Sequence, residues 1–403
     1  MPLYDPFDPS FQDDPYPTYR AMRDDQPVYR HEKLGFWALS RFGDIWDAIR
    51  RPEVFSSASG LTFYPDEIGT LGLAPTIVML DPPRHTQLRA LVGHGFTARR
   101  VRELEDGVRA FVVDRITEMG RKAADGEPVD LHQDLSSPLP TFVLAGLLGV
   151  PGTDRDRFDP WVRALVGIQD GGFTLDVITT AMDAVGEMFG YFGDLITRRR
   201  DEPADDLISA LIAAEIDGER LTDWDILGFC FVIVAGGNDT TGNLISHAVM
   251  LLDRDHRQRE LLAGDPSLIP NALLEFLRLE GSVQSLGRTT TEPVEIHGVR
   301  IPEGAKVMML YGSANRDERE FGATADRLDV TRSIPRHLGF AAGPHFCVGS
   351  HLARLQARIA LEELLARQPG IGVDTGRATR LASAFTRGWQ SLPATGIVPA
   401  ARG

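Results

Sequence analysis

The sequence reads Phe340-Ala-Ala-Gly343-Pro344-His345-Phe346-Cys347-Val348-Gly349 where a predicted helix over 348–366 begins. A Gly-Pro turn thus places Cys347 at the N-terminal edge of that helix. There the helix dipole and unpaired backbone N–H groups lower the pKa of a thiol and can donate hydrogen bonds to its sulfur. Gly349 adds no side chain, which leaves room for a flat ligand. These ten residues therefore favour a thiolate anion beside such a ligand.

The chain contains two cysteines, and they lie in different surroundings. Cys230 lies in the apolar run Leu227-Gly-Phe-Cys-Phe-Val-Ile-Val234, where a cysteine packs as a small hydrophobic side chain. The polar turn around Cys347 offers little apolar surface for that role. We therefore assign Cys230 to the core and Cys347 to a functional site. Two cysteines are also too few for a disulfide framework.

The ten residues resemble the haem-ligand signature of the cytochrome P450 superfamily, Phe-x-x-Gly-x-His-x-Cys-x-Gly. The matching residues are Phe340, Gly343, His345, Cys347 and Gly349. Ala341 stands where many members have a second glycine, a change that should not disturb ligation. The resemblance covers most of the chain and is closest to the soluble actinobacterial type. It implies that the cofactor is haem b, that Cys347 is the axial ligand of its iron, and that Phe340 packs near the sulfur.

Composition and charge restrict the class of protein. Apolar residues make up 43% of the 403 residues and charged residues 25%, as in an ordinary folded protein. The net charge of −15 argues against a nucleic-acid partner, because neutralising phosphates requires a basic face. The first eleven residues lack the pattern of a secretory signal, and no apolar run approaches the ~18 residues that span a bilayer. The sequence thus predicts a cytoplasmic protein without a membrane segment.

The spacing of apolar residues predicts a mainly α fold with a minor antiparallel β region. Helices are expected over 16–23, 42–50, 84–91, 98–119, 139–148, 175–200, 205–215, 223–252, 267–279 and 348–366. Strands are expected over 36–40, 294–301 and 306–310, so that β-rich regions lie near the N-terminus and in about 283–310 and 370–403. No linker divides the chain. We therefore expect one domain over 1–403, the single globule around haem that the resemblance implies.

The helix expected over 223–252, with Thr222 as its N-cap, contains Val234-Ala-Gly-Gly-Asn-Asp-Thr-Thr-Gly242. Glycines and capping-type residues are poor choices for a helix interior. One interpretation is a local break that forms a groove for a small molecule, and the other is close packing of two helices on the glycines. The resemblance favours the first. It implies that Asp239 passes in protons from solvent and that Thr240 hydrogen-bonds dioxygen or its water.

Two further sets of charged residues match the family. The sequence Glu275-Phe-Leu-Arg278 is similar to its Glu-x-x-Arg motif, which implies that Glu275, Arg278 and Arg332 have a structural role. Haem carries two propionates, which require charged or forked donors. The residues at the implied propionate positions are His85, Arg89, Arg288 and His345.

The substrate is expected to face a loop over 60–83, which is rich in Gly and Pro and has no apolar period. The residues expected to line the pocket are Phe63, Tyr64, Leu71, Val234, Gly237, Leu286 and Phe385. They are mostly apolar and offer few polar anchors. A small lipophilic substrate is therefore expected.

By the resemblance, the chain is a monooxygenase that uses dioxygen and two electrons from a ferredoxin, which a reductase supplies from NAD(P)H. A basic patch is the expected dock for that acidic partner, and an ordinary solvated face is the alternative. The patch comprises Arg84, Arg89, Arg99, Arg100, Arg102, His351, Arg354 and Arg358. Two other classes stay open: a haem-thiolate enzyme of another type, such as a peroxygenase or coupling enzyme, and a non-catalytic haem sensor. Asp239 and Thr240 argue against peroxide use, and the sequence shows no signalling domain.

Overall fold

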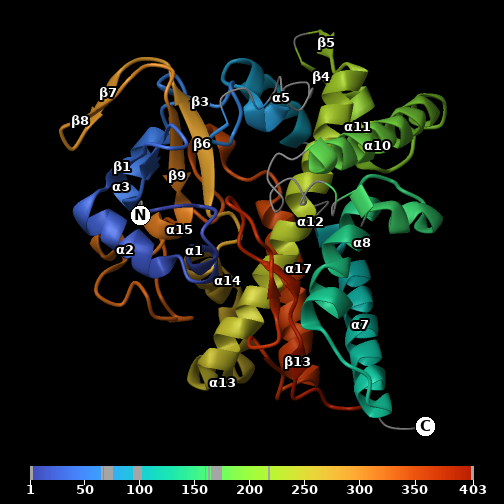
Figure 1. Ribbon diagram of the computed structural model, residues 1–403. Helices are drawn as coiled ribbons and strands as arrows, with labels where there is room; N and C mark the ends of the chain where they lie inside the picture. The colour runs from blue at the N-terminus through green and yellow to red at the C-terminus, as the bar shows by residue number, and fades with distance from the viewer. Residues whose placement is uncertain are drawn as a thin grey trace.

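The computed structural model describes residues 3–64, 67, 76–93, 102–158, 160, 161, 164, 175–216 and 218–400. A strand-rich part lies on the left of Figure 1 and a larger helical part on the right. The longer helices are α2 (Tyr16–Asp25), α5 (Arg84–Gly93), α7 (Glu105–Asp125), α8 (Pro138–Leu147), α10 (Leu175–Asp201), α12 (Asp223–Arg254), α13 (His256–Gly264), α14 (Ile269–Leu279) and α17 (Ser350–Arg367). The mainly α class is thereby confirmed. In the described part of the chain, no helix combines the length and apolarity needed to cross a bilayer.

Shorter helical pieces connect these elements. They are α1 (Pro9–Asp13), α3 (Phe42–Ala48), η1 (Ile77–Met79), η3 (His132–Ser136), η4 (Gly152–Arg157), α11 (Leu207–Ala213), η5 (Pro266–Leu268), α15 (Tyr311–Ala314), α16 (Glu318–Phe321) and η6 (Gly343–His345). Of these, η3 is a π-helical turn that leads into α8.

Most predicted helices are confirmed to within a few residues, and two differ more. The helix predicted over 98–119 is α7, which begins at Glu105 and continues to Asp125; residues 98–101 lie outside the described part. It ends there because Gly126 adopts a left-handed φ of 74°. The helix predicted over 205–215 is shorter, because Glu215 belongs to strand β4 (Glu215–Ile216).

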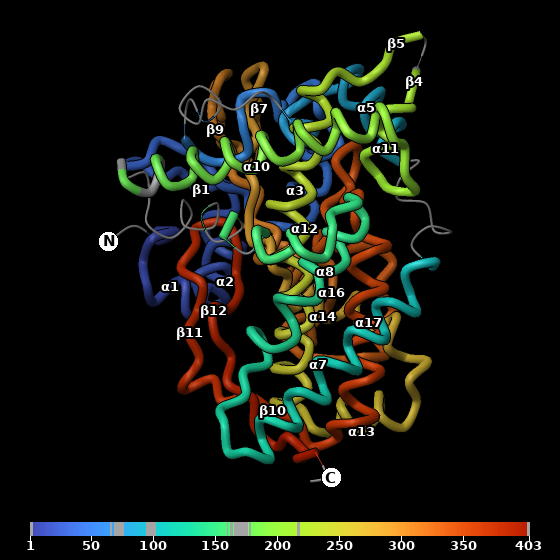
Figure 2. Tube along the Cα trace, turned by 90° about the vertical axis from the view of Figure 1, so that its right-hand side faces the viewer, coloured from blue at the N-terminus to red at the C-terminus, as the bar shows by residue number. Residues whose placement is uncertain are grey.

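The long helix α12 packs against α8, α10, α14 and α17, and Figure 2 shows it running through the middle of the molecule. Its start is fixed by a capping box. Thr222 Oγ1 accepts from the backbone N–H of Asp225 at 3.2 Å, and the Asp225 carboxylate accepts from the Thr222 N–H at 2.9 Å. The helix is uninterrupted from Asp223 to Arg254, so the predicted local break is wrong.

The glycines of α12 instead serve helix packing. A Cβ at Gly237 would lie 3.0 Å from Leu144 Cδ1 on α8, and one at Gly242 would lie 2.8 Å from the Ser136 carbonyl oxygen in η3. Only glycine therefore allows the neighbouring chain to approach this closely without displacement. Gly236 differs, because a Cβ there would meet no atom of the described residues within 4 Å, the backbone of α12 itself aside.

The main sheet contains five strands, in the order β1 (Val28–His31), β2 (Phe36–Leu39), β9 (Lys306–Leu310), β6 (Ser285–Thr290) and β3 (Phe55–Ser56). The central strand β9 is buried along its whole length. It pairs antiparallel with β6 and parallel with β2, where Val307 lies opposite Trp37. The sheet is therefore mixed rather than wholly antiparallel. Alternation of apolar residues predicts a strand, but not the direction of a partner that is remote in sequence.

Four small antiparallel sheets complete the β-rich regions. They pair β4 with β5 (Glu219–Arg220), β7 (Val294–Ile296) with β8 (Val299–Ile301), β10 (Gly372–Val373) with β13 (Ala394–Thr395), and β11 (Thr379–Arg380) with β12 (Trp389–Ser391). The hairpin predicted over 294–301 is confirmed, with His297 and Gly298 both at positive φ in its two-residue turn.

The structure brings Glu275, Arg278 and Arg332 together in the core. Arg278 donates two hydrogen bonds to the Glu275 carboxylate at 2.7 and 2.8 Å, and Arg332 Nε donates to it at 3.1 Å. The side chains of Glu275 and Arg278 are fully buried. Arg278 also donates to the carbonyl oxygens of Asn315 and Ala325, at 2.8 and 2.6 Å. The pair thus fixes the irregular chain that leads from β9 to the Cys347 loop.

That loop contains one backbone position that disfavours its residue. Ala341 adopts a φ of 54°, in the left-handed region where a Cβ is strained. The next residue, Ala342, adopts an extended φ of −152°. The glycine that many P450s carry at position 341 thus has a conformational reason.

We predict that Glu275→Ala lowers the free energy of unfolding by about 3–5 kcal/mol, because it leaves the Arg278 guanidinium charged, buried and without its carboxylate. Urea unfolding followed by circular dichroism measures the effect. The matched control is Glu118→Ala, which breaks an ion pair of the same spacing with Arg121 on the solvent side of α7. The control should leave stability nearly unchanged, and equal losses in both variants would contradict the assignment.

We predict that Ala341→Gly raises the free energy of unfolding by up to about 1 kcal/mol, because glycine adopts a left-handed φ without strain. Ala342→Gly is the control, since it frees the chain at a position without strain and should lower stability. Thermal unfolding of both variants provides the measurement. A loss of stability in Ala341→Gly as large as that in the control would refute the strain.

Candidate active site

Cys347 is held by its own loop ahead of α17. Its backbone N–H donates to the Phe340 carbonyl oxygen at 2.9 Å, which closes the loop. Burial raises the pKa of the Cys347 thiol above its ordinary value. The backbone N–H groups of Gly349 and Ser350 and the charge of Arg89 act in the opposite direction, as predicted for a helix N-terminus, but the effect of burial is larger. A cation that binds the sulfur would reverse that balance.

Four basic side chains gather beside this loop. Arg89 Nη2 donates to the Phe346 carbonyl oxygen at 2.6 Å, next to Cys347 in the sequence. The rings of His85 and His345 lie 4.2 Å apart, centre to centre. Arg288, on β6, is buried, and its charge acts on both histidines. The structure therefore brings together all four residues that the sequence assigned to propionate binding.

Within the described residues this basic group forms no ion pair, although the charge of Asp81 acts on His85. Neither Arg89 nor Arg288 forms an ion pair there with a carboxylate, and both donate to carbonyl oxygens instead. Burial, together with Arg288, His85 and Arg89, lowers the pKa of His345 to about 3. Burial and the charge of Arg89 also lower the pKa of His85, whose buried Nδ1 has no hydrogen-bond partner. The group is therefore suited to an anionic ligand.

Asp239 and Thr240 lie in the middle of α12. The Thr240 hydroxyl donates to the Gly236 carbonyl oxygen at 2.7 Å, and the Thr240 carbonyl accepts from the Ser282 hydroxyl at 2.9 Å. Burial raises the pKa of Asp239 to about 6, against the effect of the Asn243 side chain. A carboxyl group with this pKa can both take up and release a proton near neutral pH.

Three polar residues of this region were missed by the sequence analysis. Asn243 lies one turn after Asp239 and accepts from the Trp389 N–H at 3.0 Å. Ser57 forms a hydrogen bond with His345 Nε2 at 3.2 Å, and Ser282 bonds to Thr240 as described. The i, i+4 spacing from Asp239 could have identified Asn243. The two serines carry no such signal, because their partners are remote in sequence.

The predicted pocket residues are only partly brought together. The Phe63 ring lies 4.7 Å from that of Tyr64 and 5.2 Å from that of Phe385. Backbone hydrogen bonds join Leu61 to Gly287 and Phe385 to Gln284 and Ser285, which brings Leu286 near the same loop.

Two other predicted pocket residues, Val234 and Gly237, do not join this aromatic group. Val234 is fully buried in the helical core, and Gly237 lies against Leu144. Leu71 lies outside the described residues.

The predicted basic patch is partly neutralised. Arg84 pairs with Asp225 at 3.3 Å, and Arg358 pairs with Glu105 and Glu362, both at 2.8 Å. Arg99 and Arg100 lie outside the described residues. The residues of the patch that form no ion pair with a carboxylate among the described residues are Arg89, Arg102, His351 and Arg354; Arg354 contacts His351. Phe346, between Arg89 and Cys347, is one of the exposed large apolar side chains.

Comparisons with known proteins agree with the site. The cytochrome P450 family model matches residues 267–367, which include Glu275, Arg278 and Cys347. Cytochrome P450 130 of Mycobacterium tuberculosis is 45% identical over 389 residues, covering 94% of each chain. The vitamin D(3) 25-hydroxylase of Pseudonocardia autotrophica is 37% identical over 407 residues, covering 97% of this chain and 96% of the relative.

The fold is shared as well. The solved structure of cytochrome P450 CYP109Q5 from Chondromyces apiculatus superposes with a TM-score of 0.86 at 33% identity, covering 97% of both chains. Similarity of sequence and fold thus extends over nearly the whole length. The chain therefore belongs to the cytochrome P450 family, an enzyme family of monooxygenases, and haem b is its cofactor.

Proposed function

We propose that the chain is a monooxygenase in which Cys347 is the axial ligand of the haem iron and a lipophilic substrate is oxidised with electrons from a ferredoxin. The observation that carries the proposal is the position of the Cys347 sulfur. It lies beside two backbone N–H groups and next to the basic group that includes Arg89. When bound, haem supplies the redox chemistry that activates dioxygen, and a thiolate ligand favours O–O cleavage.

The residues around Cys347 fit this cofactor. The basic group of His85, Arg89, Arg288 and His345 would hold the two propionates, whose negative charges it lacks among the described residues. His85 Nδ1 is buried without a partner and can donate to one of them. A Cβ at Gly349 would meet no atom within 4 Å among the described residues beyond its chain neighbours, so a flat ring can approach there. Phe340 packs 6.3 Å from Phe346, centre to centre, and limits exposure of the loop.

Asp239 and Thr240 would deliver protons to the substrate side. With a pKa of about 6, the Asp239 carboxyl can carry a proton at neutral pH. The Thr240 hydroxyl donates to Gly236 here, and rotation about its χ1 would let it donate to water or dioxygen in the open space beside Gly236. The helix need not break for this role, since the hydroxyl alone moves.

The surface near Cys347 and a group of aromatic side chains support the proposed electron donor and substrate. Arg89, Arg102, Arg354 and the exposed Phe346 offer a basic face with an apolar centre near Cys347, which suits an acidic ferredoxin. Phe63, Tyr64 and Phe385 offer an aromatic wall to an apolar substrate. A hydroxylase of vitamin D(3) among the relatives supports a lipophilic substrate. The cytoplasmic location stays a prediction.

We predict that Cys347→Ala abolishes the absorption band that thiolate-ligated haem shows in its reduced carbon monoxide complex, because the sulfur ligand is gone. Cys230→Ala is the control. Cys230 is fully buried in the helical core, and its replacement should lower stability but keep the band. Loss of the band in Cys230→Ala and its retention in Cys347→Ala would overturn the assignment of the ligand.

We predict that Thr240→Ala uncouples reductant consumption from product formation by tenfold or so and releases hydrogen peroxide, because proton delivery loses its hydroxyl. The assay contains a ferredoxin, a reductase and a lipophilic compound that the wild-type enzyme oxidises. It measures the consumption of NADH and the amounts of product and hydrogen peroxide formed. Thr240→Ser keeps the hydroxyl and should retain most of the coupling. If both variants remain coupled as the wild type does, Thr240 has no part in proton delivery.

A further inference from the structure

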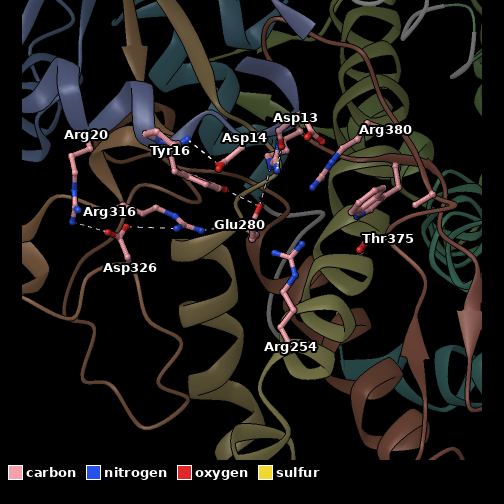
Figure 3. A pocket seen from close by; sticks show the side chains of 14 residues that line it. Asp13, Asp14, Tyr16, Arg20, Arg254, Glu280, Arg316, Asp326, Thr375 and Arg380 are labelled. Atoms are coloured by element: carbon pink, nitrogen blue, oxygen red, sulfur yellow. Dashed lines mark hydrogen bonds and ion pairs between the residues drawn. The ribbon is translucent and has the colours of Figure 1, made fainter. Parts of the chain in front are cut away.

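A second concave site lies away from the Cys347 loop. It is a cavity of about 800 Å³ between the start of α2, the end of α12, and strands β11 and β12 (Figure 3). Its charged walls include Arg254, Arg316, Arg380 and Arg387, and the one buried carboxylate among them is Glu280. Nothing in the monooxygenase chemistry uses these arginines.

Glu280 is fully occupied by three partners. Tyr16 Oη donates to it at 2.8 Å, Arg387 Nε at 3.1 Å and Arg316 Nη2 at 3.3 Å. Arg316 also stacks on the Tyr16 ring at 3.4 Å and pairs with Asp326. Arg387 donates its two other groups to the carbonyl oxygens of the chain just before Tyr16. The charge of Glu280 acts on Arg380 as well, but Glu280 forms no ion pair with it.

Two guanidinium groups on this cavity have no anionic partner among the described residues. Arg380 lies with its Cζ 3.7 Å from the centre of the Trp389 ring, and its Nε and Nη1 are shielded from solvent without a hydrogen-bond partner. Arg254 ends α12 and forms no ion pair in the described part of the chain. Figure 3 shows Arg254 pointing into the cavity from below and Arg380 from the upper right.

The interior of the cavity therefore carries excess positive charge. Burial and the neighbouring charge of Arg387 lower the pKa of Arg380 to about 10, against the opposing charges of Glu280 and Asp13, which leaves it a cation at neutral pH. The remaining carboxylates of the wall, Asp13 and Asp14, are exposed at its rim, where water screens them. An anion between the two guanidiniums would offset the charge of both, and a small rotation of the Arg380 side chain would let it donate to that anion.

We propose that this cavity binds a phosphate group between Arg254 and Arg380, with the Thr375 hydroxyl beside it. Two guanidiniums match the two charges of a phosphate and offer forked donors to its oxygens. The positive charge of Arg254 also stabilises the C-terminal end of the α12 dipole. That role explains Arg254 alone and leaves Arg380 without a function. The volume exceeds that of the phosphate group alone, so the same chemistry fits free phosphate or the phosphate end of a metabolite.

Calorimetric titration of the haem-loaded enzyme with inorganic phosphate, at constant ionic strength kept with sodium chloride, tests the proposal. Saturable binding is expected. Arg380→Gln and Arg254→Gln should each weaken it by about tenfold or more, because charge-assisted hydrogen bonds to the anion are lost. The matched control is Arg377→Gln, from the same stretch of chain, whose side chain is 73% exposed and pairs with Asp374. It should bind as the wild type does.

The haem spectrum of each variant reports the fold and the Cys347 site independently. An unchanged spectrum with weakened phosphate binding supports a separate site. Arg254 lies at the exposed end of a helix, so its variant tests the proposal even if Arg380→Gln fails to fold. Tighter binding of phenyl phosphate than of inorganic phosphate would assign the site to a phosphorylated metabolite, and equal binding would assign it to free phosphate. Absence of saturable binding, or wild-type affinity in both arginine variants, would overturn the proposal.

Discussion

Glu275 and Arg278 form an ion pair that water does not reach, and the surroundings of Cys347 depend on it. Charges in such a place require complete hydrogen bonding, since desolvation costs several kcal/mol for each ion. The pair meets that requirement by drawing in backbone groups: the carbonyl oxygens of Asn315 and Ala325, and the N–H of Asp329. Asn315 in turn accepts from the Leu338 N–H at 2.7 Å. The irregular chain that follows α16 is thereby fixed up to the loop that carries the sulfur.

The requirement that buried charges have partners also explains the space beside the sulfur, where the partners are missing from the described part of the chain. In the core, every buried charge of the Glu275 pair has its partner within the chain. Near Cys347, Arg89 and Arg288 donate to carbonyl oxygens and to no carboxylate among the described residues, and two histidines are kept neutral by burial and by these cations. A chain that satisfies its charges in one place and leaves positive charge in another reserves the second for a negatively charged ligand.

The sequence predicted most of the helices, because long apolar periods report directly on a buried face. The resemblance to the P450 family also implied which basic residues gather near Cys347, whereas each of them taken alone would suit an exposed surface. It could not predict that β2 and β9 run parallel, or that α12 stays unbroken. Gly237 and Gly242 read equally well as a break or as a contact, and only the positions of Leu144 and Ser136 decide for contact. The strain at Ala341 was likewise hidden, because a φ of 54° depends on how the loop closes.

The carboxylate of Asp225, in the first turn of α12, makes two different interactions. It completes the capping box at the start of α12, and it pairs with Arg84, the residue before His85 on α5. One side chain thus links the helix that carries Asp239 to the helix that carries two of the basic residues near the sulfur. An outward movement of α5 would break the ion pair with Arg84, so the position of α5 and the start of α12 are coupled through one carboxylate.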